Sequence, residues 1–297
     1  GSGVPAALKG CHFENNTALN YPVTKGERIE GFRDIDLIKI PLRDENGELK
    51  STSQLDTEVL NAITKTNELG RHVVLHVMDQ SKLGYQSPSE KLIQSLEQLD
   101  TLSMQIIVDA SQLRLDPKDI QNYLNKGCIV TITGSKYFTG PPYSGALIVP
   151  KNVSQAIQDV KIKMPKGLNN YYNRTDWPIA WHCSSDLSEG FNYGSNMRWN
   201  AAIVEMDRYY KTPVLYRNMG IEMFCNFIED SIKEATFLQP IYGDETKTKS
   251  FDSTEFGIRN IRTIFPFFIL KNGEALSDTQ VKKLYTLLKS DLSTKFE

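Results

Sequence analysis

The sequence lacks the features that would mark a membrane protein or a nucleic-acid-binding protein. Its 297 residues contain no run of about eighteen consecutive apolar residues, the length that a membrane-spanning helix needs. The net charge is −2, from 34 Lys and Arg against 36 Asp and Glu, so a broad basic surface for nucleic acid is absent. There is also no repeat, low-complexity tract or secretory signal. We therefore expect neither a membrane nor a nucleic acid among the partners.

Cysteine is scarce and scattered along the chain. The four cysteines, Cys11, Cys128, Cys183 and Cys225, fit no zinc-binding spacing. They indicate reduced thiols in a cytoplasmic protein without a metal site. What is present is an ordinary globular composition, with 40% hydrophobic and 24% charged residues, which is enough to build a core.

The apolar pattern between residues 35 and 160 predicts strands and helices in alternation. Short apolar runs predict strands over 35–42, 73–78, 104–108, 128–133 and 146–149. Helical spacing predicts helices over 53–69, from 87 through 99, and over 117–124 and 152–160. This alternation is typical of an α/β protein whose strands are joined by crossover helices.

The pattern changes after residue 160 and predicts a second, smaller unit. Residues 161–194 are irregular, and helices are expected over 198–210 and 214–235. Residues 236–297 predict a small α+β unit, with a strand over 261–270 and a last helix that starts at a capping box of Ser277 and Gln280. We expect a large domain over 1–195 and linking helices with a small domain over 196–297.

Two predicted strand ends carry an acid and an amine. Asp109 ends one buried strand, and Lys136 follows the next one along the chain. Because ligands bind at the carboxyl ends of parallel strands, we expect both side chains at one edge of the sheet. A lysine kept from bulk water can form a Schiff base, and a carboxylate can keep a pyridine nitrogen protonated. Alternatively, Lys136 is a solvated lysine and Asp109 caps the turn that follows it.

Side chains beside these two residues suit a phosphorylated ring. The hydroxyl groups of Thr133 and Ser135 can bind phosphate oxygens. The amide of Gln112, three residues after Asp109, can donate to a ring oxygen. The alternative is a purely structural role for all three, in which Thr133 and Ser135 form the turn and Gln112 is a surface amide.

These segments resemble the fold-type I pyridoxal-phosphate enzymes, most closely the branch of class V aminotransferases and cysteine desulfurases. The similarity covers about residues 35–150 and is carried by Asp109-Ala110-Ser111-Gln112, Thr133-Gly134-Ser135-Lys136 and Gly140-Pro141-Pro142 with Gly145-Ala146. The resemblance implies a three-layer, mostly parallel sheet with helices on both faces. It also implies pyridoxal 5'-phosphate as cofactor, a small amino-acid substrate and a homodimer.

The resemblance assigns a role to each candidate residue. Lys136 takes the place of the Schiff-base lysine, and Asp109 that of the pyridinium partner. The remaining positions contact the cofactor: Gln112 at the ring hydroxyl, Thr133 and Ser135 at the phosphate, and Ser81 in the segment after the strand over 73–78. By this resemblance the protein is an aminotransferase of the class V type.

Two alternatives follow from departures from the family pattern. Family members are usually longer, and their phosphate-cup helix and carboxylate-binding arginine have no match here, so a non-catalytic relic or a fragment is the first alternative. A cysteine desulfurase or lyase with Cys183 as a mobile nucleophile is the second, although Ser135 replaces the usual histidine. Arg198, Arg259 and Arg262 are candidates to bind a substrate carboxylate, or else are surface or capping residues.

Overall fold

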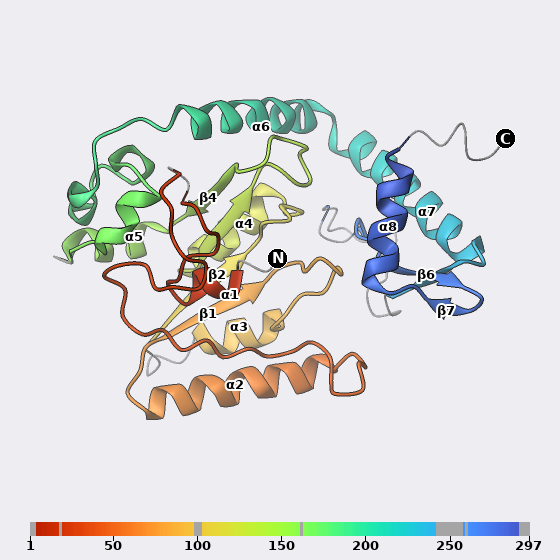
Figure 1. Ribbon diagram of the computed structural model, residues 1–297, viewed down its shortest axis with the longest axis horizontal. Coiled ribbons are helices and arrows are strands. Elements are labelled where there is room, and N and C mark those ends of the chain that lie inside the picture. The colour runs from red at the N-terminus through yellow and green to blue at the C-terminus, as the bar shows by residue number, and fades with distance from the viewer. Residues whose placement is uncertain are drawn as a thin grey trace.

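The computed structural model describes residues 4–17, 20–97, 103–160, 163–241, 258 and 261–290. A four-stranded sheet lies in the first part of the chain and a three-stranded sheet near its end (Figure 1). The strands are β1 (Val73–Met78), β2 (Met104–Asp109), β3 (Ile129–Thr133), β4 (Gly145–Ile148), β5 (Leu238–Pro240), β6 (Phe267–Lys271) and β7 (Glu274–Ala275). The α-helices are α1 (Val4–Leu8), α2 (Thr52–Glu68), α3 (Glu90–Glu97), α4 (Pro117–Asn125), α5 (Lys151–Asp159), α6 (Tyr193–Lys211), α7 (Val214–Glu234) and α8 (Asp278–Leu288). The 3-10 helices are η1 (Lys166–Asn170), η2 (Arg174–Asp176) and η3 (His182–Asp186).

The first sheet has the order β1-β2-β3-β4 and is mostly parallel. β1, β2 and β3 run parallel, and β4 returns antiparallel to β3. Helix α3 connects β1 to β2, and helix α4 connects β2 to β3, so each parallel pair is joined by a helical crossover. The predicted α/β class with a mostly parallel sheet is confirmed.

One face of this sheet is packed against helices α2, α3 and α4. Alternate strand residues point to this face, and Val77, Val108 and Val130 are each 0% exposed. Ile93 of α3 and Tyr123 of α4 belong to the same buried cluster. Burying one such side chain contributes roughly 1.5–3 kcal/mol. This core fixes the strands whose carboxyl ends carry the candidate residues.

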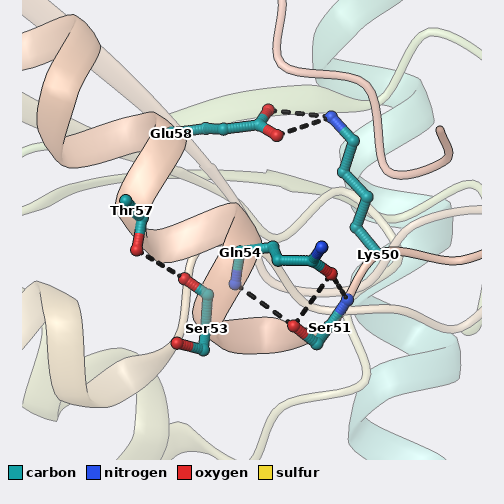
Figure 2. Close-up of polar contacts among 6 residues, drawn as sticks. All are labelled: Lys50, Ser51, Ser53, Gln54, Thr57 and Glu58. Carbon is teal, nitrogen blue, oxygen red and sulfur yellow. Dashed lines mark hydrogen bonds and ion pairs between the residues drawn. The ribbon is translucent and has the colours of Figure 1, made fainter.

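Helix α2 starts at a reciprocal cap that Figure 2 shows in detail. The Ser51 hydroxyl accepts a hydrogen bond from the backbone N–H of Gln54 at 3.3 Å, and the Gln54 side chain accepts one from the backbone N–H of Ser51 at 2.8 Å. Lys50 adds an ion pair to Glu58 at 2.8 Å. Two otherwise unpaired N–H groups are thereby satisfied, and the first turn is anchored.

Helix α6 leads from the first sheet towards the C-terminal elements α7, β6, β7 and α8 (Figure 1). It begins at Tyr193, five residues before the predicted start at Arg198, because the side chain of Asn192 caps it by accepting from the backbone N–H of Ser195 at 3.0 Å. The boundary predicted between residues 195 and 196 stays a prediction.

Two predicted strands differ from the structure. The run over 35–42 forms no strand, because it has no neighbouring strand to pair with, and Ile35 and Ile38 are 42% and 59% exposed. The strand predicted from 261 starts only at Phe267, directly after Pro266, which has no N–H to donate to a ladder. The capping box of Ser277 and Gln280 is confirmed.

Candidate active site

Asp109 is the last residue of β2 and lies between the ends of two neighbouring strands. It is in register with Met78 of β1 and Thr131 of β3. Its carboxylate oxygen Oδ1 accepts hydrogen bonds from the backbone N–H of Ser111 at 3.0 Å and from the Thr131 hydroxyl at 3.4 Å. These bonds hold the carboxylate at the carboxyl edge of the sheet.

Lys136 follows β3 by three residues and reaches the same edge. Its Nζ donates a hydrogen bond to the Ser111 hydroxyl at 3.2 Å. Burial lowers the pKa of Lys136, and the charge of Asp109 opposes this shift. Ser111 therefore contacts both residues, through its N–H to Asp109 and its hydroxyl to Lys136. The structure brings together the acid and the amine that the sequence predicted at one sheet edge.

The loop that carries Lys136 is closed by two glycines against helix α6. The N–H of Gly140 donates to the carbonyl of Gly134 at 2.8 Å. A Cβ added to Gly134 would lie 2.4 Å from the Cβ of Ala202, and one added to Gly140 would lie 2.7 Å from the same atom. Ala202 is fully buried in this contact. The absence of side chains at both glycines thus allows α6 to lie directly on the loop.

Aromatic residues next to Lys136 anchor the loop to the same helix, further along its length. Tyr137 and Phe138 both meet the ring of Tyr209 edge-on, at centroid distances of 5.6 and 5.3 Å. Burial raises the pKa of Tyr137, so its hydroxyl stays protonated and bonds to that of Tyr209 at 3.3 Å. The Arg217 guanidinium lies 4.3 Å from the centre of the Tyr209 ring. The loop that carries Lys136 is therefore held in place by packing against aromatic side chains.

The other predicted cofactor-binding side chains are engaged with protein groups. The hydroxyls of Thr133 and Ser135 are bonded to each other at 2.8 Å. The side-chain oxygen of Gln112 accepts from Nη1 of Arg114 at 2.8 Å. Ser81 accepts from the backbone N–H groups of Leu83 and Tyr85 within its own turn. Thr133 is the last residue of β3, and the other three lie in the segments that follow β1, β2 and β3. Their contacts to a cofactor stay predictions.

Sequence reasoning missed Arg114, which lies beside Gln112 at this edge. Its charge helps to lower the pKa of Lys136, as does that of Lys82. Its guanidinium carbon lies 5.5 Å from the centre of the Tyr137 ring. A basic residue two positions after Gln112 in a strand-end segment is the signal that would have found it.

His76 shares the sheet face of Asp109. Met78 is opposite Asp109, and His76 lies two residues earlier on β1, so both point to the same side. Burial lowers the pKa of His76, and the negative charge of Asp109 acts against this shift. His76 is therefore a neighbour of Asp109 on β1, whereas Lys136 follows β3 on the opposite side of β2.

The remaining candidates lie elsewhere. Arg198 stacks over Tyr143 at 5.9 Å, and Arg262 pairs with Glu229 at 3.4 Å. Arg259 lies outside the described residues. Cys183 lies in η3, and its role as a nucleophile stays a prediction.

A cavity of about 940 Å³ lies over the second face of the sheet at β3 and β4. Thr131 and Leu147 form its floor, and its walls include residues of η1, η2 and the start of α6. Its aromatic side chains include Tyr171, Trp177 and Trp199. Within the described residues, no group of three or more His, Cys, Asp or Glu is placed to hold a metal ion. The helices in the described part of the chain are all too short or too polar to cross a membrane.

The comparison with solved structures gives a remote likeness. No protein-family model matches the chain, and no curated protein matches it significantly. A crystal structure of mouse CSAD in apo form is similar to this chain with 11% sequence identity and a TM-score of 0.42. The similarity covers 85% of this chain and 48% of that one, so the chain spans about half the length of this structure. A likeness of this size carries no statement about family or activity.

Proposed function

We propose that this chain belongs to a pyridoxal-phosphate-dependent enzyme that acts on a small amino acid, with Lys136 as the residue that joins the cofactor covalently. The single observation that supports it is the convergence of Lys136 and Asp109 on Ser111 at the carboxyl edge of a mostly parallel sheet. Such an edge is where ligands of α/β proteins bind.

The donor set at this edge fits the cofactor. Pyridoxal phosphate supplies a carbonyl that an amine can attack and a ring that withdraws electrons when its nitrogen is protonated. Lys136 supplies the amine, and its lowered pKa increases the fraction that is neutral and nucleophilic. Asp109 supplies a carboxylate that can hold a proton on a ring nitrogen. The hydroxyls of Thr133 and Ser135 can turn from each other towards a phosphate.

The residues of the chain would then perform two tasks. Lys136, once released by an incoming amino acid, moves a proton at the substrate α-carbon. Asp109 offers its carboxylate as the partner of the ring nitrogen, and hydrogen bonds from the backbone N–H of Ser111 and the hydroxyl of Thr131 hold that carboxylate in place. An aminotransferase of the class V type is the activity we propose, in a cytoplasmic homodimer.

Absorption spectroscopy tests this proposal. The purified chain, mixed with pyridoxal phosphate, is expected to show a visible absorption band that the free cofactor lacks. Lys136→Ala should abolish the band. Lys118→Ala is the matched control, since Lys118 is exposed on α4 and should leave the band unchanged. A band that survives in Lys136→Ala would contradict the assignment of this lysine.

A non-catalytic protein that retains the fold is the second candidate. This candidate is favoured because the side chains of Gln112 and Ser81 form hydrogen bonds with other groups of the protein. A cofactor titration separates the two candidates. Saturable uptake of pyridoxal phosphate, with turnover of an amino acid, excludes the non-catalytic protein, and no uptake at all excludes the enzyme.

A further inference from the structure

Helix α7 exposes an apolar face along its first two thirds. Between Val214 and Phe227, all of which the structure describes, no exposed residue carries a charge, and Asn226 is the only exposed polar side chain. The exposed apolar side chains of this stretch include Leu215, Tyr216, Met219, Met223, Phe224 and Phe227. The exposed residues that follow on the helix are Asp230, Ser231, Lys233 and Glu234, as on an ordinary solvated face. The apolar face is therefore a patch with a definite end.

The size of this patch approaches one side of a protein–protein interface. Tyr216, Phe224 and Phe227 are 71%, 65% and 69% exposed. Since an aromatic side chain has about 150–250 Å² to bury, these three rings alone expose roughly 300–500 Å². A stable interface takes about 800 Å² from each partner, and aromatic residues and methionine are enriched in it. The patch is extended towards that size by Leu215, Met219 and Met223.

Gly220 lies in the middle of this patch, and contacts within the described chain do not explain it. Its φ is not positive, and a Cβ added to it would meet no atom within 4 Å. Glycine inside a helix is nevertheless less stable than alanine. Gly134 differs, because Ala202 lies where its Cβ would be. A second body that lies on α7 at Gly220 would explain the missing side chain.

The patch is complementary to a copy of itself. Tyr216, Gly220, Met223 and Phe227 follow one another at intervals of four, three and four residues, so they form one stripe along the helix. These intervals are the same in both directions. When two such stripes run antiparallel across a two-fold axis, Tyr216 faces Phe227 of the other copy, and Gly220 faces Met223. The long Met223 side chain then occupies the space left by Gly220, as a knob fills a hole.

We propose that α7 pairs antiparallel with α7 of a second copy of this chain through the stripe of Tyr216, Gly220, Met223 and Phe227. Because the stripe carries no charge, the two copies meet there without repulsion. The inference goes beyond the proposed function, since it names the surface through which two copies associate and does not depend on pyridoxal phosphate.

Sedimentation equilibrium of the full chain, without added cofactor, tests the proposal. The wild-type chain is expected to form a dimer at concentrations between about 1 and 100 µM, the range for the weaker interfaces of standard size. Met223→Glu should raise the dissociation constant at least about tenfold, because it buries an unpaired carboxylate against the other copy. Met197→Glu is the matched control: Met197 lies on α6 and is 70% exposed, against 69% for Met223. It should leave the dissociation constant unchanged.

Gly220→Leu separates the pairing from effects on the fold. In the single chain the new side chain enters open space on a helix, so this variant should be at least as stable as wild type. In the dimer the same side chain collides with Met223 of the second copy, so the dissociation constant should rise at least about tenfold. Gly220→Leu also decides the question if Met223→Glu does not fold.

Three results would overturn the proposal. They are a wild-type chain that stays monomeric, a dimer that survives Met223→Glu or Gly220→Leu, and a dimer that Met197→Glu weakens as much as Met223→Glu does. A monomer that Met223→Glu destabilises would show that another part of the same chain covers the stripe. A monomer that takes up pyridoxal phosphate would refute the α7 pairing alone, and a dimer paired through α7 that takes up none would refute the proposed function alone.

Discussion

Replacing Gly134 with alanine tests whether the loop of Lys136 is held by direct contact with α6. The new Cβ would lie 2.4 Å from the Cβ of Ala202, whereas its next neighbours are Ser144 Oγ at 3.3 Å and Met206 Cε at 3.6 Å. Carbon atoms prefer separations of about 3.5–4.0 Å, so the first contact alone forces a movement of more than about 1 Å. Ala202 is a short side chain on a helix and has no rotamer with which to avoid it. We expect a loss of about 1–3 kcal/mol in the free energy of unfolding.

The same contact predicts a rescue. Ala202→Gly removes the obstructing atom and by itself costs about 1 kcal/mol as a glycine inside a helix. The double variant should be less destabilised than the sum of the two single variants, with a coupling of about 1 kcal/mol or more. Gly145→Ala is the control, because the nearest atom to its new Cβ is the carbonyl oxygen of Ile132 at 3.9 Å. It should change stability by no more than about 0.5 kcal/mol.

Urea denaturation followed by circular dichroism measures all four variants, with unchanged m-values as the check on a common two-state transition. Additive effects of Gly134→Ala and Ala202→Gly would show that the Cβ of Ala202 does not obstruct a side chain at position 134. So would a Gly134→Ala variant as stable as Gly145→Ala.

Two further predictions concern the cap of α2 and the amine of the site. Ser51→Ala should lower the free energy of unfolding by about 0.5–2 kcal/mol, because the reciprocal cap is lost. Ser53→Ala is the control and should leave the free energy of unfolding unchanged, since the Ser53 hydroxyl takes no part in the cap. Urea denaturation measures both variants. Burial lowers the pKa of Lys136, so its amine becomes neutral at a lower pH than the amine of an ordinary lysine. An amine-specific reagent near pH 7 should therefore modify Lys136 faster than Lys118. Peptide mass spectrometry measures the two rates.

The parallel strands and their ends could be predicted from the sequence because local signals agree there. Each is a short apolar run that polar or turn residues end, and Asp109 and Lys136 mark two of these ends. Neighbouring parallel strands place their carboxyl ends together, so the proximity of the two side chains followed from the order of elements. The failed strand at 35–42 had the same local signal but no strand beside it, and pairing is a property of the whole fold.

The contacts that shape the edge could not be predicted, because they join distant parts of the chain. Arg114 donates one hydrogen bond to Thr263, 149 positions away, and another to the side chain of Gln112. Ser111 links Asp109 and Lys136 only because both of their side chains point towards it, and the apolar periodicity of the sequence does not encode these directions. The tight approach of Gly134 to Ala202 likewise comes from the path of α6 over the loop.

Reductive trapping of the cofactor tests whether Lys136 is the residue that binds pyridoxal phosphate covalently. The chain is incubated with pyridoxal phosphate, reduced with borohydride to fix any covalent link between cofactor and lysine, digested, and analysed by mass spectrometry. We expect one dominant modified peptide, with the cofactor on Lys136. Label distributed over other lysines such as Lys118, with Lys136 unmodified, would contradict this assignment.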